Sequence, residues 1–247
     1  MIVWLASFPR SGNTFLRIVL HRHFGIRSAV VYDFDGVAEC VGRELVGFQD
    51  RPASYDEMRG SDEIHFIKTH RQRDDCVHEA DRAICLVRDG RDALVSYAHL
   101  RSTQDRRPFK VILEELILTR AEQGTGGWGQ NVLSWLLPPA ENRTILRYDD
   151  LVKEPATAVA KAMKTLRLDI QPHSEATTPT FTDLKQVDDG FFRRGQTGTY
   201  LDEMPNELQD RFWSIPDNAA AISHEGTYPS RMTTPGQRDP ISIKFFQ

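Results

Sequence analysis

The first twenty-five residues change from the hydrophobic pattern of a strand to that of a helix. Residues 2–7 (IVWLAS) form a nearly continuous apolar run with β-branched and aromatic members, typical of a strand buried on both faces of a parallel sheet. Pro9 ends this run, and from Asn13 onward apolar residues recur at helical spacing. Residues 8–13 are therefore predicted to form the turn between a strand and a helix that ends near Gly25.

Similar alternations of short apolar runs and longer amphipathic segments continue along the chain. Further strands are predicted over 64–69, 83–87 and 144–148, and helices over 37–46, 93–100, 109–121, 131–137, 151–166, 180–187 and 205–213. Strands that alternate with helices favour parallel pairing. The sequence predicts an α/β fold with a central parallel sheet flanked by helices and a phosphate-binding loop after the first strand.

Composition supports one globular domain. The chain has 247 residues, of which 40% are hydrophobic and 27% charged, and it contains neither an internal repeat nor a clear linker. We expect a single domain over residues 1–247, with 226–247 as an extended or mobile tail rich in Pro, Thr, Ser and Arg. The formal net charge of -4 argues against a general nucleic-acid binder, so any anion site is expected to be local.

The cysteines and the hydropathy of the chain indicate the cellular compartment in which the protein is expected. The three cysteines, at positions 40, 76 and 85, include no CxxC pair and predict neither a disulfide framework nor a zinc site. No stretch approaches the roughly 18 to 20 apolar residues of a membrane span, and the first apolar run lacks the features of a signal peptide. We expect a cytoplasmic protein with no membrane partner.

The turn after the first strand is a candidate anion site. It contains Arg10, Ser11, Gly12, Asn13 and Thr14, at or beside the first turn of the predicted helix. Backbone N–H groups at a helix N-terminus have no intrahelical partner, and the helix dipole favours an anion there. The alternative is an ordinary capped turn with a surface arginine. The GxxxxGK[ST] loop of nucleoside triphosphatases is not met, so ATP with magnesium is not the first choice.

Two further strand ends and one late loop carry candidate groups. Lys68 and His70 lie two residues apart at the end of the second predicted strand, so both point to one side; alternatively, the lysine is solvated and the histidine caps a loop. Arg88 follows the next strand, and Ser96 lies about two helical turns further on. Arg88 and Ser96 are expected to bind one phosphate together, unless Arg88 pairs with Asp92. The loop containing Arg193, Arg194 and Gly195 is a second anion clamp or a solvated charged turn.

Five motifs taken in order resemble the cytosolic-type sulfotransferase family. They are PRSGNTF (9–15), IKTH (67–70), LVRDGRDALVSY (86–97), LRYDDL (146–151) and RRGQTG (193–198). The resemblance covers roughly residues 1 to 200. It implies the donor 3'-phosphoadenosine 5'-phosphosulfate (PAPS), the product adenosine 3',5'-bisphosphate (PAP) and no metal.

The resemblance also implies roles for residues. The loop at Arg10, Ser11, Gly12, Asn13 and Thr14 would hold the 5'-phosphosulfate, whereas Arg88, Ser96, Arg193, Arg194 and Gly195 would hold the 3'-phosphate. Phe15, Tyr148 and Phe181 match positions that contact adenine. His70 matches the general base, and Lys68 and Arg10 would stabilise charge on the leaving phosphate.

Four positions depart from the commonest pattern of that family. Arg10 replaces a lysine, Asn13 replaces a threonine and is expected to donate through its amide, and Phe15 stands where tryptophan is frequent. Tyr200, after Thr199 in place of an aspartate, also stands where tryptophan is frequent. These changes bear on how the donor is held and on the geometry of the late loop.

The function expected is transfer of a sulfuryl group from PAPS to a hydroxyl or amine of a small-molecule acceptor. Two alternatives stay open: a nucleotide or small-molecule kinase with an atypical phosphate loop, and a non-catalytic PAP-binding module. The acceptor pocket is expected to involve 30–37, 123–128 and the C-terminal tail, where acidic residues hint at a cationic acceptor. The acceptor's identity and a homodimeric state stay open.

Overall fold

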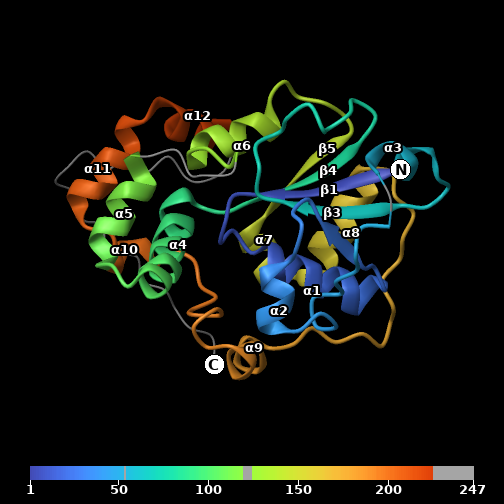
Figure 1. The fold of residues 1–247 in the computed structure, drawn as a ribbon, viewed down its shortest axis with the longest axis horizontal. Helices are drawn as coiled ribbons and strands as arrows, with labels where there is room; N and C mark the ends of the chain where they lie inside the picture. The colour runs from blue at the N-terminus through green and yellow to red at the C-terminus, as the bar shows by residue number, and fades with distance from the viewer. Residues whose placement is uncertain (53, 119–123, 225–247) are drawn as a thin grey trace.

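Five parallel strands form the central sheet of the computed structural model, which describes residues 1–52, 54–118 and 124–224 (Figure 1). The strands are β1 (Ile2–Ser7), β2 (Ser28–Val30), β3 (His65–Thr69), β4 (Arg82–Val87) and β5 (Arg143–Arg147). Their order across the sheet is β2-β3-β1-β4-β5. The first strand of the sequence therefore occupies the centre, and the carboxyl ends of all five strands meet at one edge.

The four predicted strands are confirmed to within about a residue, with two differences. Tyr148, predicted as the end of a strand, is the first residue of a helix, because β5 stops at Arg147. The edge strand β2 was not predicted, since its three residues are too few for a periodic signal to emerge. The expected parallel α/β architecture is confirmed.

Most helices follow the predicted pattern. Their bounds are α1 (Asn13–Phe24), α2 (Gly36–Val41), α3 (Tyr55–Gly60), α4 (Gly90–Asp105), α5 (Phe109–Leu118), α6 (Trp128–Leu136), α7 (Tyr148–Lys153), α8 (Pro155–Thr165), α9 (Phe181–Val187), α10 (Tyr200–Glu203), α11 (Asn206–Ser214) and α12 (Pro216–His224). The last residues of the helix predicted over 109–121 and the predicted tail over 226–247 lie outside the described residues.

Two predicted helices are corrected by the structure. The segment 151–166 belongs to two helices, because Glu154 leaves the helical conformation (φ -137°) and Pro155, which lacks a backbone N–H, starts the second at its first position. The helix predicted over 37–46 ends at Val41, where Gly42 takes φ 101°. The helices α3, α10 and α12 lack a predicted counterpart.

Helices cover both faces of the sheet. On one face, Val3 and Leu5 of β1 pack with apolar residues of α1, α7 and α8. On the other, Trp4 packs with Met58 of α3 and Trp135 of α6. This alternation along β1 explains why the strand reads as continuously apolar.

A second group of helices stands beyond the carboxyl ends of the strands (Figure 1). Apolar residues of α4, α5, α6, α11 and α12 form one cluster, which includes Trp128 and Phe212. The strand ends on one side and this helical layer on the other bound the candidate site. Among the described residues, no helix has both the length and the apolar character needed to cross a bilayer.

Candidate active site

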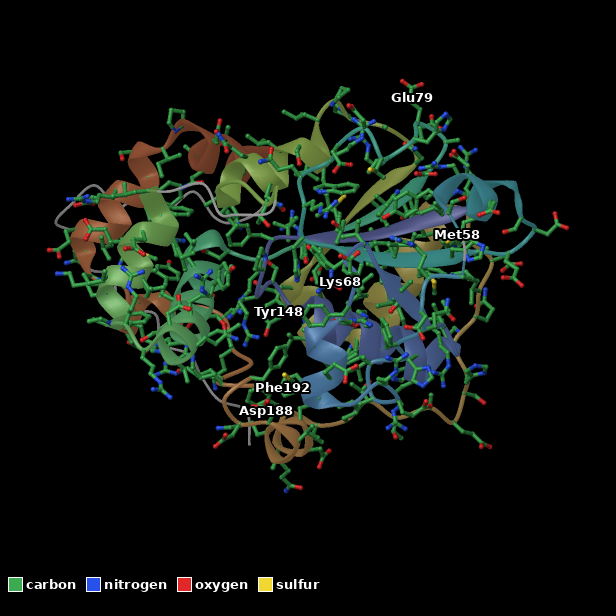
Figure 2. The ribbon with its side chains drawn as sticks, viewed as in Figure 1. Met58, Lys68, Glu79, Tyr148, Asp188 and Phe192 are labelled. Atoms are coloured by element: carbon green, nitrogen blue, oxygen red, sulfur yellow. The ribbon has the colours of Figure 1, made fainter. Side chains whose placement is uncertain are left out.

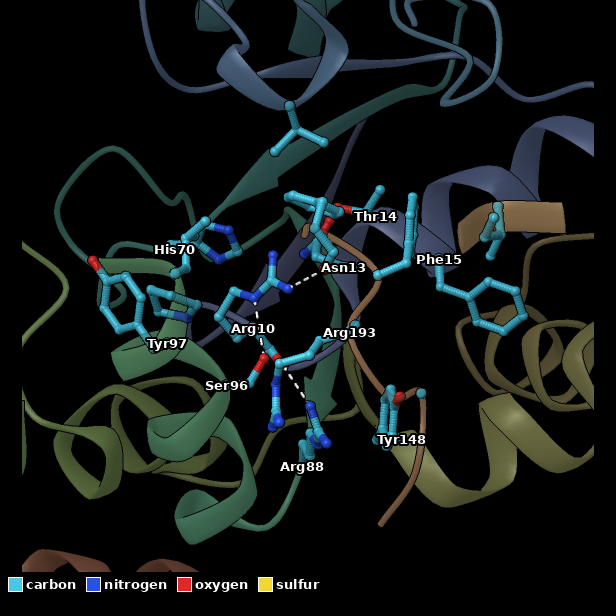
Figure 3. Close-up of a pocket in the computed structure, with 18 of the residues that line it drawn as sticks. Arg10, Asn13, Thr14, Phe15, His70, Arg88, Ser96, Tyr97, Tyr148 and Arg193 are labelled. Atoms are coloured by element: carbon cyan, nitrogen blue, oxygen red, sulfur yellow. Dashed lines mark hydrogen bonds between the residues drawn. The ribbon is translucent and has the colours of Figure 1, made fainter. Parts of the chain in front are cut away.

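A cavity of about 840 Å³ opens at the carboxyl ends of the strands (Figure 3). The residues predicted for the site that line it are Arg10, Gly12, Asn13, Thr14, Phe15, Lys68, His70, Arg88, Ser96, Tyr148, Phe181, Arg193, Arg194 and Gly195. Ser11, which is 1% exposed, does not line it. In Figure 2, Lys68, Tyr148 and Phe192, from three distant parts of the chain, lie between the sheet and α9.

The turn after β1 leaves the N-terminus of α1 without a side-chain cap. Gly12 takes the N-cap position with φ 100°, where a side chain would be strained. A Cβ at Gly12 would also lie 2.6 Å from Cδ2 of Tyr148. The hydroxyl of Ser11 is buried with no hydrogen-bond partner. Unpaired donors at a helix N-terminus fit an anionic ligand.

Asn13 uses its side-chain amide inside the protein. Nδ2 donates to the Leu5 carbonyl at 2.9 Å and to Oγ of Ser7 at 3.0 Å. Both bonds tie α1 to β1. The expectation that this amide donates to the ligand is therefore not met by the geometry, and the side chain fixes the position of the turn.

Arg10 reaches across the cavity to α4 and to the late loop. Its Nε donates to Oγ of Ser96 at 3.2 Å, its Nη2 donates to the Phe191 carbonyl, and its Cζ lies 4.3 Å from the centre of the Phe191 ring. Burial, reinforced by the charge of Arg88, lowers the pKa of Arg10 to about 10. Ser96 thus contacts Arg10, and the expectation that Ser96 and Arg88 hold one phosphate stays a prediction.

Arg88 ties the turn to the late loop. It is 7% exposed, and its two Nη atoms donate to the Arg10 carbonyl at 3.0 Å and the Gln196 carbonyl at 2.8 Å. Its Cζ lies 4.4 Å from the centre of the Tyr148 ring. Its Nε is buried without a partner. A buried cation that retains an unpaired donor is suited to an anionic ligand.

The Asp92 carboxylate binds the late loop and does not pair with Arg88. Its carboxylate accepts from the Gly198 N–H at 2.7 Å, from the Thr199 hydroxyl at 2.9 Å and from the Tyr200 N–H at 3.0 Å. The alternative of an Arg88–Asp92 ion pair, left open by the sequence, is wrong. Asp92 fixes the end of the loop that carries Arg193.

The two arginines of the late loop share a carboxylate. Nη1 of Arg193 lies 2.8 Å from Glu203, and Nη1 of Arg194 lies 3.3 Å from it. Nε of Arg193 is buried without a partner. A Cβ at Gly195 would lie 2.4 Å from the Phe181 ring. The loop is therefore not a solvated turn, and it presents Arg193 to the same cavity as Arg88 (Figure 3).

His70 is held in one tautomer by the end of β1. Its Nδ1 lies 2.8 Å from the Ser7 carbonyl, and because a carbonyl oxygen only accepts, Nδ1 carries the proton and Nε2 is the basic nitrogen. Desolvation, with a contribution from the charge of Lys68, lowers the pKa of His70 well below its usual value. The imidazole is therefore neutral at neutral pH.

Lys68 is a buried cation next to that imidazole. It is 6% exposed, and burial lowers its pKa to about 8, against the opposing effect of Asp35. Its Nζ lies 5.2 Å from the centre of the Tyr32 ring. A neutral base and a lysine of lowered pKa in one cavity are typical of catalytic sites.

The sequence did not reveal the supporting roles of three residues. The hydroxyl of Tyr32 accepts from the His70 N–H at 2.9 Å. Nδ2 of Asn131 donates to the His70 carbonyl at 2.8 Å. Asp92 holds the late loop. Tyr32 lies in a segment without clear periodicity, and the other two lie on helices, where single polar residues give no signal of their contacts. Among the described residues, no group of three His, Cys, Asp or Glu side chains could hold a metal ion.

Comparison with known structures supports the fold. Mouse sulfotransferase SULT7A1 complexed with PAP has a TM-score of 0.61 and 17% identity, and the match covers 90% of this chain and 88% of that one. Retinol dehydratase in complex with retinol and PAP has a TM-score of 0.56 and 16% identity, over 97% of this chain and 83% of that one. At these identities the likeness shows the fold alone.

Sequence comparison defines the family. WSCD family member CG9164 of Drosophila melanogaster is 26% identical over 220 residues, which are 84% of this chain and 62% of that relative. The chain thus spans less than two thirds of the relative's length. The model of the sulfotransferase domain matches residues 2–223. The chain therefore belongs to the sulfotransferase domain family.

Proposed function

We propose that this protein transfers a sulfuryl group from PAPS to a hydroxyl or amine of a small-molecule acceptor. The observation that carries this proposal is the tautomer of His70. With Nδ1 bound to the Ser7 carbonyl, the basic Nε2 belongs to a cavity that also contains Lys68 and Arg10. A neutral base beside two cations suits a reaction in which a nucleophile loses a proton while an anion departs.

The residues present fit a donor with two phosphate groups. One set of unpaired donors surrounds the N-terminus of α1, where the Ser11 hydroxyl is buried without a partner. The other set contains the buried Nε atoms of Arg88 and Arg193. Burying donors without partners costs about 1–3 kcal/mol each, a cost that phosphate oxygens would relieve. Phe15, Tyr148 and Phe181 line the same cavity and would contact the adenine.

Each catalytic residue then has a separate task. PAPS, when bound, supplies the sulfuryl group and leaves as PAP. Nε2 of His70 accepts the proton of the attacking acceptor group. Lys68 and Arg10 stabilise the negative charge that develops where the phosphate departs. Arg88 and Arg193 bind the donor's other phosphate.

The test is PAPS-dependent transfer to a panel of alcohols, phenols and amines by wild type and variants. His70→Ala and Lys68→Ala are each expected to lower kcat by about 100-fold or more, typical of removing a proton-transfer or charge-stabilising group. Arg88→Ala and Arg193→Ala are expected mainly to weaken PAP binding. A fully active His70→Ala variant would contradict the assignment of the base.

Two binding measurements separate the alternatives. For a sulfotransferase, PAP raises Tm more than ATP with magnesium does. A larger shift with magnesium ATP would favour a kinase. PAP binding with no transfer to any acceptor, in wild type as in His70→Ala, would favour a binding module.

A further inference from the structure

One part of the cavity is not accounted for by groups that would bind the donor. It is lined by the segment after β2, by Arg71 after β3, by the middle of α4 and by Thr125. Of these residues, Figure 3 labels Tyr97 of α4. Its residues are Val31, Tyr32, Asp33, Phe34, Arg71, Tyr97, Leu100, Arg101 and Thr125. Because His70 immediately precedes Arg71, this part of the cavity is where an acceptor would meet the base.

The surfaces of this region are mainly aromatic and aliphatic. The Tyr32 hydroxyl accepts from the backbone N–H of His70, and the Tyr32 ring lines the cavity. Phe34 is 72% exposed at the rim. Tyr97 packs edge-on against Phe8 with ring centres 6.2 Å apart. Such walls favour a flat, largely apolar body on the acceptor.

Of the two arginines of this region, Arg71 is the one that forms no ion pair among the described residues. Its Cζ lies 5.6 Å from the centre of the Tyr32 ring, the same ring that Lys68 approaches at 5.2 Å. No carboxylate of the described residues forms an ion pair with it. By contrast, Arg101 pairs with Asp105 at 3.0 Å.

The acidic residues of this segment do not create a site for a cation. Asp35 is buried and pairs with Arg17 at 2.6 Å. Asp33 is exposed to solvent. Within 30–37, the acidic residues therefore favour a cationic acceptor less than their number suggests, since the more enclosed of the two carboxylates already pairs with Arg17.

We propose that Arg71 binds a carboxylate of the acceptor, so that the acceptor is an aromatic acid whose hydroxyl is sulfated. This inference rests on the proposed function, because it assigns the acceptor side of the same cavity. The Arg71 guanidinium and the Lys68 ammonium both approach the Tyr32 ring, at 5.6 and 5.2 Å from its centre, and the Tyr32 hydroxyl accepts from the His70 backbone N–H. In this proposal Arg71 holds the carboxylate of the acceptor, and the hydroxyl to be sulfated lies at Nε2 of His70 in the same cavity. Arginine binds carboxylates through two parallel N–H donors, which would orient the ring.

The test compares 4-hydroxyphenylacetate with its neutral amide, 4-hydroxyphenylacetamide. Isothermal titration measures the Kd of each probe for protein saturated with PAP, which keeps the acid out of the phosphate sites. We expect the acid to bind at least about tenfold more tightly than the amide, as a hydrogen-bonded ion pair in a partly enclosed site allows. Arg71→Gln is expected to reduce this preference to about one.

Arg73→Gln is the matched control. Arg73 lies two residues further along the same loop and does not line the cavity. Its variant should keep the preference for the acid. Equal binding of acid and amide, absence of binding by either, or a preference that persists in Arg71→Gln would overturn the inference.

The same titrations separate this inference from the proposed function. PAP binding without a preference for the acid would overturn the role of Arg71 alone. Absence of PAP binding would overturn the proposed function and, with it, the assignment of the acceptor side.

Discussion

Nη1 of Arg17 donates to Oδ2 of Asp35 across 2.6 Å, and both side chains are shielded from solvent. Nε of Arg17 also donates to Oγ of Ser28 at 2.8 Å. The other oxygen of Asp35 accepts from the Val37 N–H at 3.2 Å and caps α2. The pair thus joins α1, β2 and α2, and the charges of both residues act on the pKa of Lys68.

We predict that Asp35→Asn lowers the free energy of unfolding by about 3–5 kcal/mol, because it leaves the Arg17 guanidinium buried without its counter-charge. Asparagine can still cap α2, so the substitution isolates the charge. Urea denaturation measures the change. The control is Asp33→Asn, because Asp33 lies two residues before Asp35 and is exposed. This substitution should change the free energy of unfolding by less than about 0.5 kcal/mol. Equal stability of both variants would show that the pair contributes little.

The pKa values of Lys68 and His70 predict the pH dependence of catalysis. Lys68 is charged only below about pH 8, so kcat/KM for PAPS should fall as pH rises above about 8. His70 has a pKa well below its usual value and stays neutral as pH falls through 6.5, so no acid limb is expected near that pH. Initial rates between pH 5 and 10 test both limbs. A Lys68→Arg variant should lack the limb near pH 8, because arginine stays charged.

An acid limb near pH 6.5 would contradict the assignment of a desolvated His70 as the base. An alkaline limb that persists unchanged in Lys68→Arg would assign that limb to another group. The reference for Lys68→Arg is its PAP affinity at pH 7, which must match that of the wild type for the two profiles to report on catalysis.

The contacts of Asp92 with the late loop predict that this carboxylate supports donor binding. Its two oxygens accept from three donors of residues 198–200. In Asp92→Asn, the new NH₂ group would face an N–H donor, and the loop would lose at least one bond. We expect PAP binding to weaken by about tenfold to 100-fold, since each charge-assisted bond contributes about 1.5–3 kcal/mol. Isothermal titration with PAP measures this.

The control for Asp92 is Asp105→Asn, at the end of the same helix, where the carboxylate pairs with Arg101 near the surface. That variant should bind PAP as the wild type does, because exposed ion pairs contribute little. An Asp92→Asn variant with unchanged PAP affinity would mean that the loop keeps its position without this carboxylate.

The sequence predicted the strand ends better than the contacts between them. Buried strands such as 2–7 are short, nearly continuous apolar runs, and the groups after them, including His70 and Arg88, necessarily meet at one edge of a parallel sheet. By contrast, the partner of Asp92 lies more than one hundred residues away. The tautomer of His70 likewise depends on a carbonyl of β1. Such pairings depend on tertiary packing, which local patterns do not encode.

Arg10 allows the effect of charge to be separated from that of hydrogen bonding. Its guanidinium donates hydrogen bonds to other parts of the protein: Nε donates to Oγ of Ser96, and Nη2 donates to the Phe191 carbonyl. Arg10→Lys keeps the charge but loses this bridge to the late loop. We expect kcat to stay within about tenfold of wild type, while PAP binding weakens. Arg10→Gln, which removes the charge, should lower kcat by about 100-fold, the effect of losing one group that stabilises developing charge. Single-turnover rates at saturating PAPS separate the two effects, because they do not depend on donor affinity. If Arg10→Lys proved as slow as Arg10→Gln at saturation, the bridge to Ser96 and Phe191, rather than the positive charge, would be the contribution of Arg10 to catalysis.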